Sequence, residues 1–249
     1  SRAADNVARQ QVLDLPAAPL TGPFGSARLR QLPVLYGFSP AVVPRPADWD
    51  ANIHVTGYWF LDSAAGWTPP PALAEFLDDG PPPVYVGFGS MASRQPEETA
   101  DLVLRALAET GQRAVMLLGW AGLRADRLPA SVIMVESVPH AWLFPRVAAV
   151  VHHGGAGTTA AGLRAGAPSV LIPFFGDQAF WAARVQALGV GPTPISRREL
   201  TAARLATAIH QAVTDEALRR RAADLGATIR AEDGIGHAVA FFASLSKSV

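Results

Sequence analysis

From residue 83 onward the chain alternates short apolar runs with segments of helical periodicity. The apolar runs lack the polar alternation of a half-exposed strand, which is typical of strands covered on both faces in a parallel sheet. They predict strands at 83–88, 114–118, 132–135, 148–151 and 170–172. The intervening segments suit right-handed helical crossovers. We therefore expect an α/β fold with a doubly wound, Rossmann-like parallel sheet, whose ligand sits beyond the carboxyl ends of the strands.

Three segments carry specific helix signals. Residues 96–110 have apolar side chains at helical spacing, a proline in the first turn and a glycine as the stop. Ser196 and Glu199 have the spacing of a capping box, which predicts a helix that starts there and runs through 200–209. A last helix is expected over 235–245.

The first part of the chain does not complete such a cycle. Residues 31–39 and 53–60 each resemble a strand, and two strands alone do not make a stable core. Residues 63–82 are rich in Pro, Gly, Ala and Asp, which indicates a linker around a short helix. We therefore predict three parts, at 1–62, 63–82 and 83–249.

Composition excludes several function classes. Of the 249 residues, 49% are hydrophobic, so the chain can bury a large core. Basic and acidic residues number 21 each, which argues against a nucleic-acid binder. Without cysteine there are no disulfides, thiolate metal sites or cysteine nucleophiles. Lys247 is the only lysine, and with the abundant alanine this indicates a GC-rich coding bias and hence a bacterial origin.

The sequence contains no sign of membrane insertion or export. No apolar stretch reaches about eighteen residues, so we expect no transmembrane helix. Residues 1–5 lack a signal-peptide core and an initiating methionine. We expect a cytoplasmic protein, whose chain begins inside a longer reading frame or after trimming, and peripheral membrane contact stays an open alternative.

The main candidate site is the glycine-rich turn after strand 148–151. Residues 152–159 read His-His-Gly-Gly-Ala-Gly-Thr-Thr and lead into a helix. Bare backbone N–H groups at a helix N-terminus favour a phosphate or diphosphate, and His153, Thr158 and Thr159 can add donors. The run matches neither a P-loop nor the dinucleotide fingerprint. The alternative is a tight turn that binds nothing.

A second candidate follows strand 170–172. Asp177 and Gln178 stand side by side, which suits bidentate hydrogen bonding to vicinal hydroxyls, as on a sugar. The alternative is that Asp177 caps the helix starting at Gln178, and the two roles are compatible.

Two further strand ends carry polar groups. Residues 87–91 form a strand end and a glycine turn, with Ser90 aimed at a helix start. At Val138-Pro139-His140, backbone and imidazole can hold a flat heterocycle. The alternative for His140 is an ordinary buried histidine.

These motifs, in one order along nearly the whole chain, resemble the family 1 glycosyltransferases of GT-B fold, and among them the sterol 3β-glucosyltransferase branch. The matching motifs are 35–40, 54–60, 83–91, 138–145, 152–159, 165–168, 173–178 and 188–192. The resemblance implies inverting transfer from UDP-glucose to a hydroxyl. It also implies that 1–62 ends an N-terminal acceptor domain and that 83–249 is the C-terminal donor-binding domain.

The resemblance implies a role for each motif. Val138 and His140 would border the uracil, and Asp177 and Gln178 would grip glucose hydroxyls. The diphosphate would be held by Ser90, His153, Ala156, Gly157 and Thr158.

Two positions are less defined. Trp120 is a weaker pocket candidate, equally well read as a packed loop aromatic. Ala161 stands where plant relatives of the broader family carry a ribose-binding Glu. Because the sterol branch is also Ala-like there, the departure supports that branch. It leaves no identified side chain that would recognise the ribose and so select UDP over TDP.

The resemblance also implies what the reaction needs. The helix amides, the hydroxyls and His153 suit the charge that develops on the departing diphosphate, so no metal or other cofactor is expected. The general base and most of the acceptor pocket would precede Ser1. No catalytic residue is therefore assigned. The isolated chain is expected to bind the donor but to transfer sugar poorly or not at all.

The expected partners are a UDP-sugar and a lipophilic small-molecule acceptor. Two alternatives stay open: a glycosyltransferase of secondary metabolism, acting on a polyketide, terpenoid or glycopeptide, and a non-catalytic nucleotide-binding module. The sequence does not decide the acceptor, the oligomeric state or the packing of residues 1–62.

Overall fold

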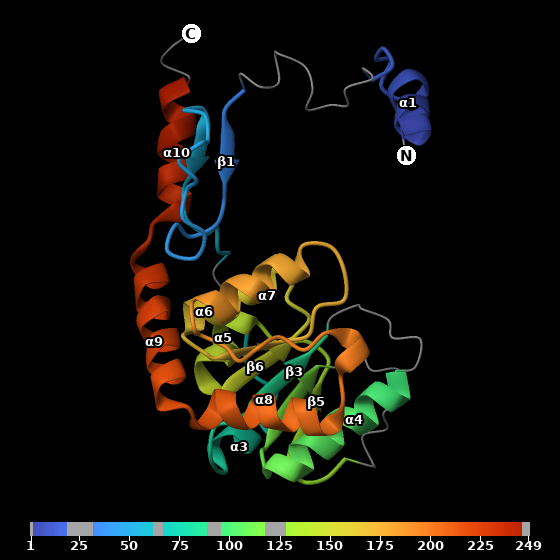
Figure 1. Ribbon diagram of the computed structural model, residues 1–249, viewed down its shortest axis with the longest axis vertical. Coiled ribbons are helices and arrows are strands. Elements are labelled where there is room, and N and C mark those ends of the chain that lie inside the picture. Colours follow the sequence, from blue (N-terminus) through green and yellow to red (C-terminus); the bar gives the residue numbers. More distant parts are fainter. Residues whose placement is uncertain (1, 19–31, 62–66, 89–95, 118–127, 246–249) are drawn as a thin grey trace.

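The computed structural model describes residues 2–18, 32–61, 67–88, 96–117 and 128–245 (Figure 1). Within these ranges the strands form two sheets, and all their pairings are parallel. The small sheet pairs β1 (Val34–Tyr36) with β2 (Ile53–Val55). The large sheet contains β3 (Val84–Gly87), β4 (Ala114–Leu117), β5 (Val132–Val135), β6 (Ala149–His152) and β7 (Ser169–Leu171). The predicted doubly wound α/β fold is confirmed in this second sheet.

The strand order of the large sheet defines where a ligand can bind. The order is β5-β4-β3-β6-β7, so the winding direction reverses between β3 and β6. These two strands are in register from Val84 beside Ala149 to Gly87 beside His152. Crevices at such a reversal, beyond the carboxyl ends of the strands, are the usual ligand sites of doubly wound sheets.

Helices cover both faces of the large sheet. The described helices are α1 (Arg2–Gln11), α3 (Pro71–Asp78), α4 (Pro96–Thr110), α5 (His140–Leu143), α6 (Ala156–Ala165), α7 (Gln178–Ala187), α8 (Ala202–Thr214), α9 (Glu216–Ala231) and α10 (Gly234–Leu245), with 3₁₀ turns η3 (Phe144–Arg146) and η4 (Arg197–Glu199). Of these, α1 and α10 lie away from the large sheet (Figure 1). Along β3, Val84 and Val86 pack with α4 and α8, whereas Tyr85 packs on the other face with α3 and α5. This alternation follows from the two-residue period of a strand.

The small sheet is covered by the end of the chain. Helix α10 lies along β1 and β2, and the His54 and Phe241 rings are 4.4 Å apart (Figure 1). At the same place the His237 Nδ1 atom is 3.1 Å from the Thr56 carbonyl oxygen. The sequence placed 235–245 with the donor-binding part, whereas the structure places α10 beside the first strands. The division at residues 62 and 82 stays a prediction.

Several sequence predictions hold and one helix start is wrong. The five predicted strands of the large sheet and the helices at 96–110 and 235–245 are found within one or two residues. The strand-like segments predicted at 31–39 and 53–60 form only the three-residue strands β1 and β2. The predicted short helix of the linker is α3, whose Leu73 is buried in the core. The capping-box prediction is wrong, because Ser196 precedes only the turn η4, and α8 begins at Ala202 after an N-cap at Thr201.

Helices α1 and α9 were not predicted. Helix α9 buries four residues, among them Leu218 and Ile229, whereas α1 buries none. Within the described ranges, every helix is too short or too polar to cross a bilayer.

Candidate functional site

The predicted phosphate site lies at the reversal point of the large sheet. Strand β6 ends at His152, and a three-residue turn leads into α6. The neighbouring strand β3 ends at Gly87. Ser90 and Trp120, two of the predicted ligand contacts, lie outside the described residues.

The turn before α6 requires a glycine at one position. Gly154 has φ +84°, a left-handed conformation that favours glycine. A Cβ atom at this position would also lie 3.1 Å from the Gln178 carbonyl oxygen and from the Leu171 Cδ2 atom. Gly154 therefore allows the turn to bend and lets the start of α7 pack closely against it.

The first turn of α6 presents its backbone N–H groups outward. Gly155 occupies the N-cap position and gives no side-chain cap. The first N–H of this helix to bond a backbone carbonyl is that of Thr159, which donates to Gly155 at 2.9 Å. A Cβ at Gly157 would meet nothing within 4 Å, so an open space adjoins the helix end. These amides and the positive end of the helix dipole suit an anion.

His153 stands beside this helix end with a defined tautomer. Its Nδ1 accepts a hydrogen bond from the Gly155 N–H at 2.9 Å. The proton of the neutral ring is therefore on Nε2, which is a donor. Burial lowers the pKa of His153 from its ordinary value, and the nearby Asp177 carboxylate opposes that shift. His153 is thus a neutral donor at pH 7, close enough to Asp177 to sense its charge.

His152 and Thr159 do not face this space. The His152 Nδ1 accepts from the Gly154 N–H at 3.1 Å, and its Nε2 is buried without a partner in the described part of the chain. Burial, then the neighbouring His153 and His140, lower the pKa of His152 to about 3. The Thr159 hydroxyl is also buried and unpartnered, so the expectation that it donates to a phosphate is wrong.

Asp177 and Gln178 behave differently although they are adjacent. Asp177 is exposed and makes no side-chain cap of α7, so the capping alternative is wrong. Its Oδ2 instead accepts from the Trp181 Nε1 at 2.8 Å. Gln178 is buried, and its Oε1 accepts from the Phe174 N–H at 2.7 Å and the Phe175 N–H at 3.2 Å. The Gln178 side-chain amide thus holds the loop before α7, while the Asp177 carboxylate faces solvent.

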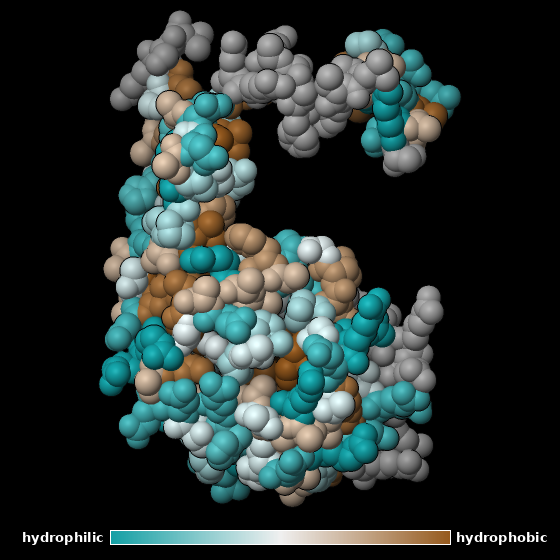
Figure 2. Space-filling model, viewed as in Figure 1, coloured by the Kyte–Doolittle hydropathy of each residue, from teal (hydrophilic) through white to brown (hydrophobic). Residues whose placement is uncertain are grey.

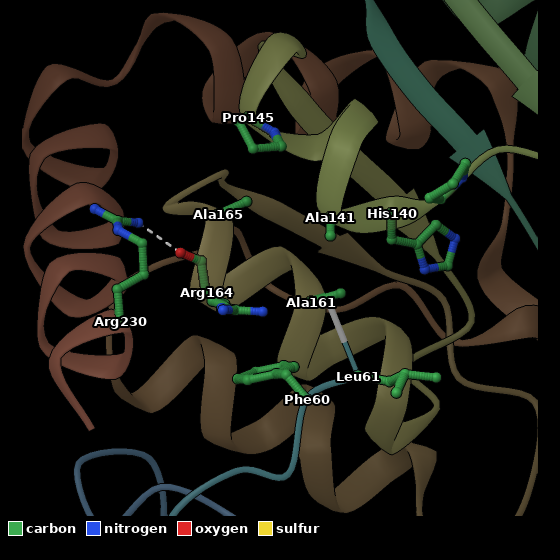
Figure 3. Close-up of a pocket in the computed structure, with 10 residues that line it drawn as sticks. Phe60, Leu61, His140, Ala141, Pro145, Ala161, Arg164, Ala165 and Arg230 are labelled. Atoms are coloured by element: carbon green, nitrogen blue, oxygen red, sulfur yellow. Dashed lines mark hydrogen bonds between the residues drawn. The ribbon is translucent and has the colours of Figure 1, made fainter. Parts of the chain in front are cut away.

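The predicted uracil end is a cavity of about 740 Å³ (Figure 3). His140 and Ala161 both line it, from α5 and α6 respectively. The His140 ring stacks on Phe144 at 4.3 Å, with its Nε2 3.3 Å from the Tyr85 hydroxyl oxygen, and burial lowers its pKa. Val138 is buried in the core, so only its backbone can border a ligand.

Sequence reasoning did not single out several residues of this cavity, among them Phe60, Arg164 and Arg230. The Arg164 guanidinium carbon lies 4.4 Å from the centre of the Phe60 ring. Arg230 donates to the Arg164 carbonyl oxygen at 2.5 Å (Figure 3). Arg164 stands three positions after Ala161 and therefore on the same helix face, a signal that the sequence contained. Phe60 and Arg230 come from distant segments and had no such signal.

The chain matches the family described as "Erythromycin biosynthesis protein CIII-like, C-terminal domain" over residues 100–234. This match covers more than half of the chain and includes α5, α6, α7 and the turn between β6 and α6. The chain belongs to this family. The family name refers to a C-terminal domain, as the resemblance to the second half of a GT-B protein implied.

Curated relatives are named sterol glucosyltransferases. Sterol 3-beta-glucosyltransferase UGT80A2 of Arabidopsis thaliana is 44% identical over 243 residues, which are 96% of this chain and 38% of that protein. A sterol 3-beta-glucosyltransferase of Cryptococcus neoformans is 43% identical over 93% of this chain and 16% of its own length. The resemblance to the sterol branch is confirmed. The chain spans well under half of each of these two relatives.

A third relative comes from a bacterium. O-mycaminosyltylonolide 6-deoxyallosyltransferase of Streptomyces fradiae is 44% identical over 87% of this chain and 51% of that protein. Because similar relatives come from a plant, a fungus and a bacterium, they do not support the bacterial origin that composition suggested.

Solved structures share the fold at low sequence identity. The calicheamicin glycosyltransferase CalG4 matches 100% of this chain and 62% of its own chain, with TM-score 0.72 and 22% identity. The glycotransferase of kitacinnamycin matches 80% of this chain and 51% of its own, with TM-score 0.66 and 24% identity. These matches confirm the predicted GT-B type of α/β fold.

Proposed function

We propose that this chain is the donor-binding half of an inverting glycosyltransferase that moves glucose from UDP-glucose to a hydroxyl of a sterol-like lipophilic acceptor. The observation that carries the proposal is the neutral His153 donor beside the outward N–H groups of α6. The plant and fungal relatives are named as sterol 3-beta-glucosyltransferases, which supports glucose as the donor sugar and a sterol-like acceptor.

The chemistry follows from the charge of the leaving group. The acceptor oxygen forms a bond to the anomeric carbon as the bond to the diphosphate oxygen breaks, and the electron pair leaves with UDP. In this mechanism the α6 amides and the His153 Nε2–H would lie where this negative charge develops, and such preorganised donors stabilise a transition state. No divalent metal is needed for this step in the proposed mechanism. The acceptor proton goes to a base outside this chain.

The sugar and the nucleoside of the donor would bind in the parts of the site beside the diphosphate. Asp177 would bind hydroxyls of the sugar, with Gln178 shaping the loop beside it. The nucleoside would lie in the cavity of His140 and Ala161. Because Ala161 offers no carboxylate to a ribose, a preference for UDP over TDP would have to come from the base.

The decisive test is UDP binding measured by isothermal titration calorimetry. The His153→Asn variant keeps an acceptor for the Gly155 N–H, since an Asn side chain can form the same local turn, but it lacks the Nε2 donor. We expect UDP affinity to fall roughly tenfold to hundredfold, the worth of a hydrogen bond to a charged group. The matched control is His210→Asn on the exposed face of α8, which should bind UDP as the wild type does.

Two outcomes would contradict the proposal. One is the absence of UDP binding by the wild-type chain, which would favour a module without a donor site. The other is robust glucose transfer to a sterol by the purified chain alone, because we propose that its base and most of its acceptor pocket lie elsewhere in the protein.

The runner-up is a glycosyltransferase of secondary metabolism. The similarity to the Streptomyces enzyme favours it, because that relative is as similar as the plant enzyme and is named for a tylonolide acceptor. Assays of the full-length protein with a sterol and with a macrolide aglycone would separate the two acceptor classes.

A further inference from the structure

A second cavity adjoins the first turn of α6 and shares Phe60 and Leu61 with the cavity of His140. Its volume is about 410 Å³. On one side are the starts of α6 and α7, and on the other are the segments 37–38, after β1, and 58–61, after β2. The lining residues are Gly37, Phe38, Tyr58, Trp59, Phe60, Leu61, Ala156, Gly157, Ala160 and Trp181. No charged side chain is among them, so the cavity suits an uncharged apolar ligand.

The aromatic walls of this cavity are braced by contacts within the protein. The Phe38 and Trp181 rings pack edge to face with centroids 6.4 Å apart, and the Tyr58 and Phe60 rings are 5.3 Å apart. Trp59 donates from Nε1 to the Thr56 hydroxyl at 2.8 Å. Flat rings held in place are typical of preformed small-molecule pockets, and about 300–1,000 Å³ is their usual size.

The cavity opens toward the donor site. Ala156, Gly157, Trp59 and Leu61 are its exposed lining residues, so its mouth lies between the first turn of α6 and the segment leaving the small sheet. Ala156 and Gly157 also belong to the proposed diphosphate site. A ligand in this cavity would therefore touch the same helix end as the donor.

Trp181 links the cavity to the sugar end of the donor site. Its ring is a wall of the cavity, and it is only 8% exposed. Its Nε1–H donates to the Asp177 Oδ2 at 2.8 Å. One residue thus contacts both the apolar ligand space and the carboxylate that would hold the sugar.

We propose that this aromatic cavity receives the apolar ring system of the acceptor, and that Trp181 is the positioning residue of the Asp177 carboxylate. This inference rests on the proposed function. An acceptor lying against Trp181 would be next to the sugar held by Asp177, which is where its hydroxyl has to react. This chain would therefore contribute a wall of the acceptor site, although the base lies elsewhere.

The first test uses the fluorescent sterol dehydroergosterol, delivered from cyclodextrin, with its anisotropy as the binding signal. Trp59→Ala removes a wall of the cavity and should weaken sterol binding about tenfold, as expected for the loss of a large aromatic contact. UDP affinity should stay unchanged. The control is Phe242→Ala, an exposed aromatic on α10 remote from the cavity, which should leave both affinities unchanged.

The second test separates the two roles of Trp181. Trp181→Phe keeps an aromatic wall and removes the N–H that holds Asp177. Sterol and UDP affinities should stay within about twofold, whereas the extra affinity of UDP-glucose over UDP should fall about tenfold, the worth of one charge-assisted hydrogen bond. Thermal melting checks that the variant is folded.

Distinct results would overturn the inference and the proposed function. If Trp59→Ala binds sterol as tightly as the wild-type chain, sterol does not occupy the cavity. If Phe242→Ala weakens sterol binding as much as Trp59→Ala does, sterol binds exposed apolar surface and not the cavity. An unchanged UDP-glucose preference in Trp181→Phe would remove the positioning role. Failure of the wild-type chain to bind UDP would reject the donor site itself, whatever the sterol result.

Discussion

At the residue scale, the two consecutive histidines at the end of β6 use the same backbone contact for different purposes. Each Nδ1 accepts from the N–H two residues later, so each neutral ring carries its proton on Nε2. For His152 that proton is buried, whereas His153 is half-buried beside the open helix end. The pair was visible in the sequence. The sequence predicts His153 as the donor, and the burial of His152 agrees with that choice, because successive side chains at a strand end alternate between the two faces.

Gly157 offers a test that separates stability from binding. It lies in α6, where alanine is favoured over glycine by roughly 0.5–1 kcal/mol. Because a Cβ there would meet no protein atom within 4 Å, Gly157→Ala should keep or slightly raise the melting temperature. The same methyl group would project into the proposed diphosphate site, so calorimetry should detect UDP binding at least about tenfold weaker. A variant that binds UDP as the wild type does would place the diphosphate elsewhere.

The buried His152 predicts acid sensitivity of the fold. Its pKa is about 3 in the folded chain and 6.5 when unperturbed, so the unfolded state binds the proton more readily. Stability from the neutral ring is complete above about pH 6.5 and is lost as the pH falls toward 3. The melting temperature should therefore drop in acid. His152→Asn, which can still accept from the Gly154 N–H, should show a smaller drop, and the exposed His210→Asn should match the wild type.

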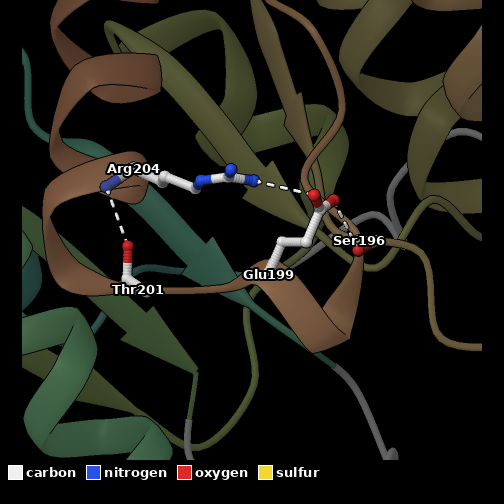
Figure 4. A network of polar contacts seen from close by, with 4 residues as sticks. All are labelled: Ser196, Glu199, Thr201 and Arg204. Atoms are coloured by element: carbon white, nitrogen blue, oxygen red, sulfur yellow. Dashed lines mark hydrogen bonds and ion pairs between the residues drawn. The ribbon is translucent and has the colours of Figure 1, made fainter.

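At the element scale, α8 shows why one helix start was misread. The Ser196 hydroxyl donates directly to the Glu199 Oε2 at 2.7 Å, and Glu199 also pairs with Arg204 at 3.1 Å (Figure 4). The two side chains therefore bond to each other and not to the backbone, as a capping box requires. The Thr201 hydroxyl instead accepts from the Arg204 N–H at 3.2 Å. Spacing identified the interacting residues but not which of them caps the helix.

This reading can be checked by thermal and urea unfolding. Thr201→Ala removes the true cap and should lower the free energy of unfolding by about 1 kcal/mol. Ser196→Ala loses only an exposed side-chain pair and should stay within about 0.5 kcal/mol of the wild type. Equal losses would mean that both hydroxyls contribute to the start of α8.

At the scale of the whole molecule, the features predicted correctly are formed by residues close in sequence, and the features missed join residues far apart in sequence. The parallel strands and the turn at 152–159 were readable, because apolar runs and glycine turns are local signals. The second cavity was not, since Phe38 and Trp181 are brought together only by the fold. The part-buried hydrogen bond from the Ser39 hydroxyl to Glu232, at 2.6 Å, likewise joins residues 193 positions apart.

The part of the molecule that contains α10 and the small sheet exposes several apolar side chains. Figure 2 shows hydrophobic residues along the column that contains α10 and the small sheet. The exposed side chains there include Val34, Tyr36, Val239 and Phe242. Exposed apolar surface of this kind often marks an interaction site.

Because α10 packs on the small sheet, this part of the chain can complete its folding only after the C-terminal helix has been synthesised. The contact between Thr56 and His237 joins positions 181 residues apart, so β1 and β2 leave the ribosome long before the helix that covers them. The large sheet is continuous in sequence and can assemble in the meantime. Closure of the chain onto its earliest strands is therefore a late, long-range step, and contacts of such separation are the slow ones in folding.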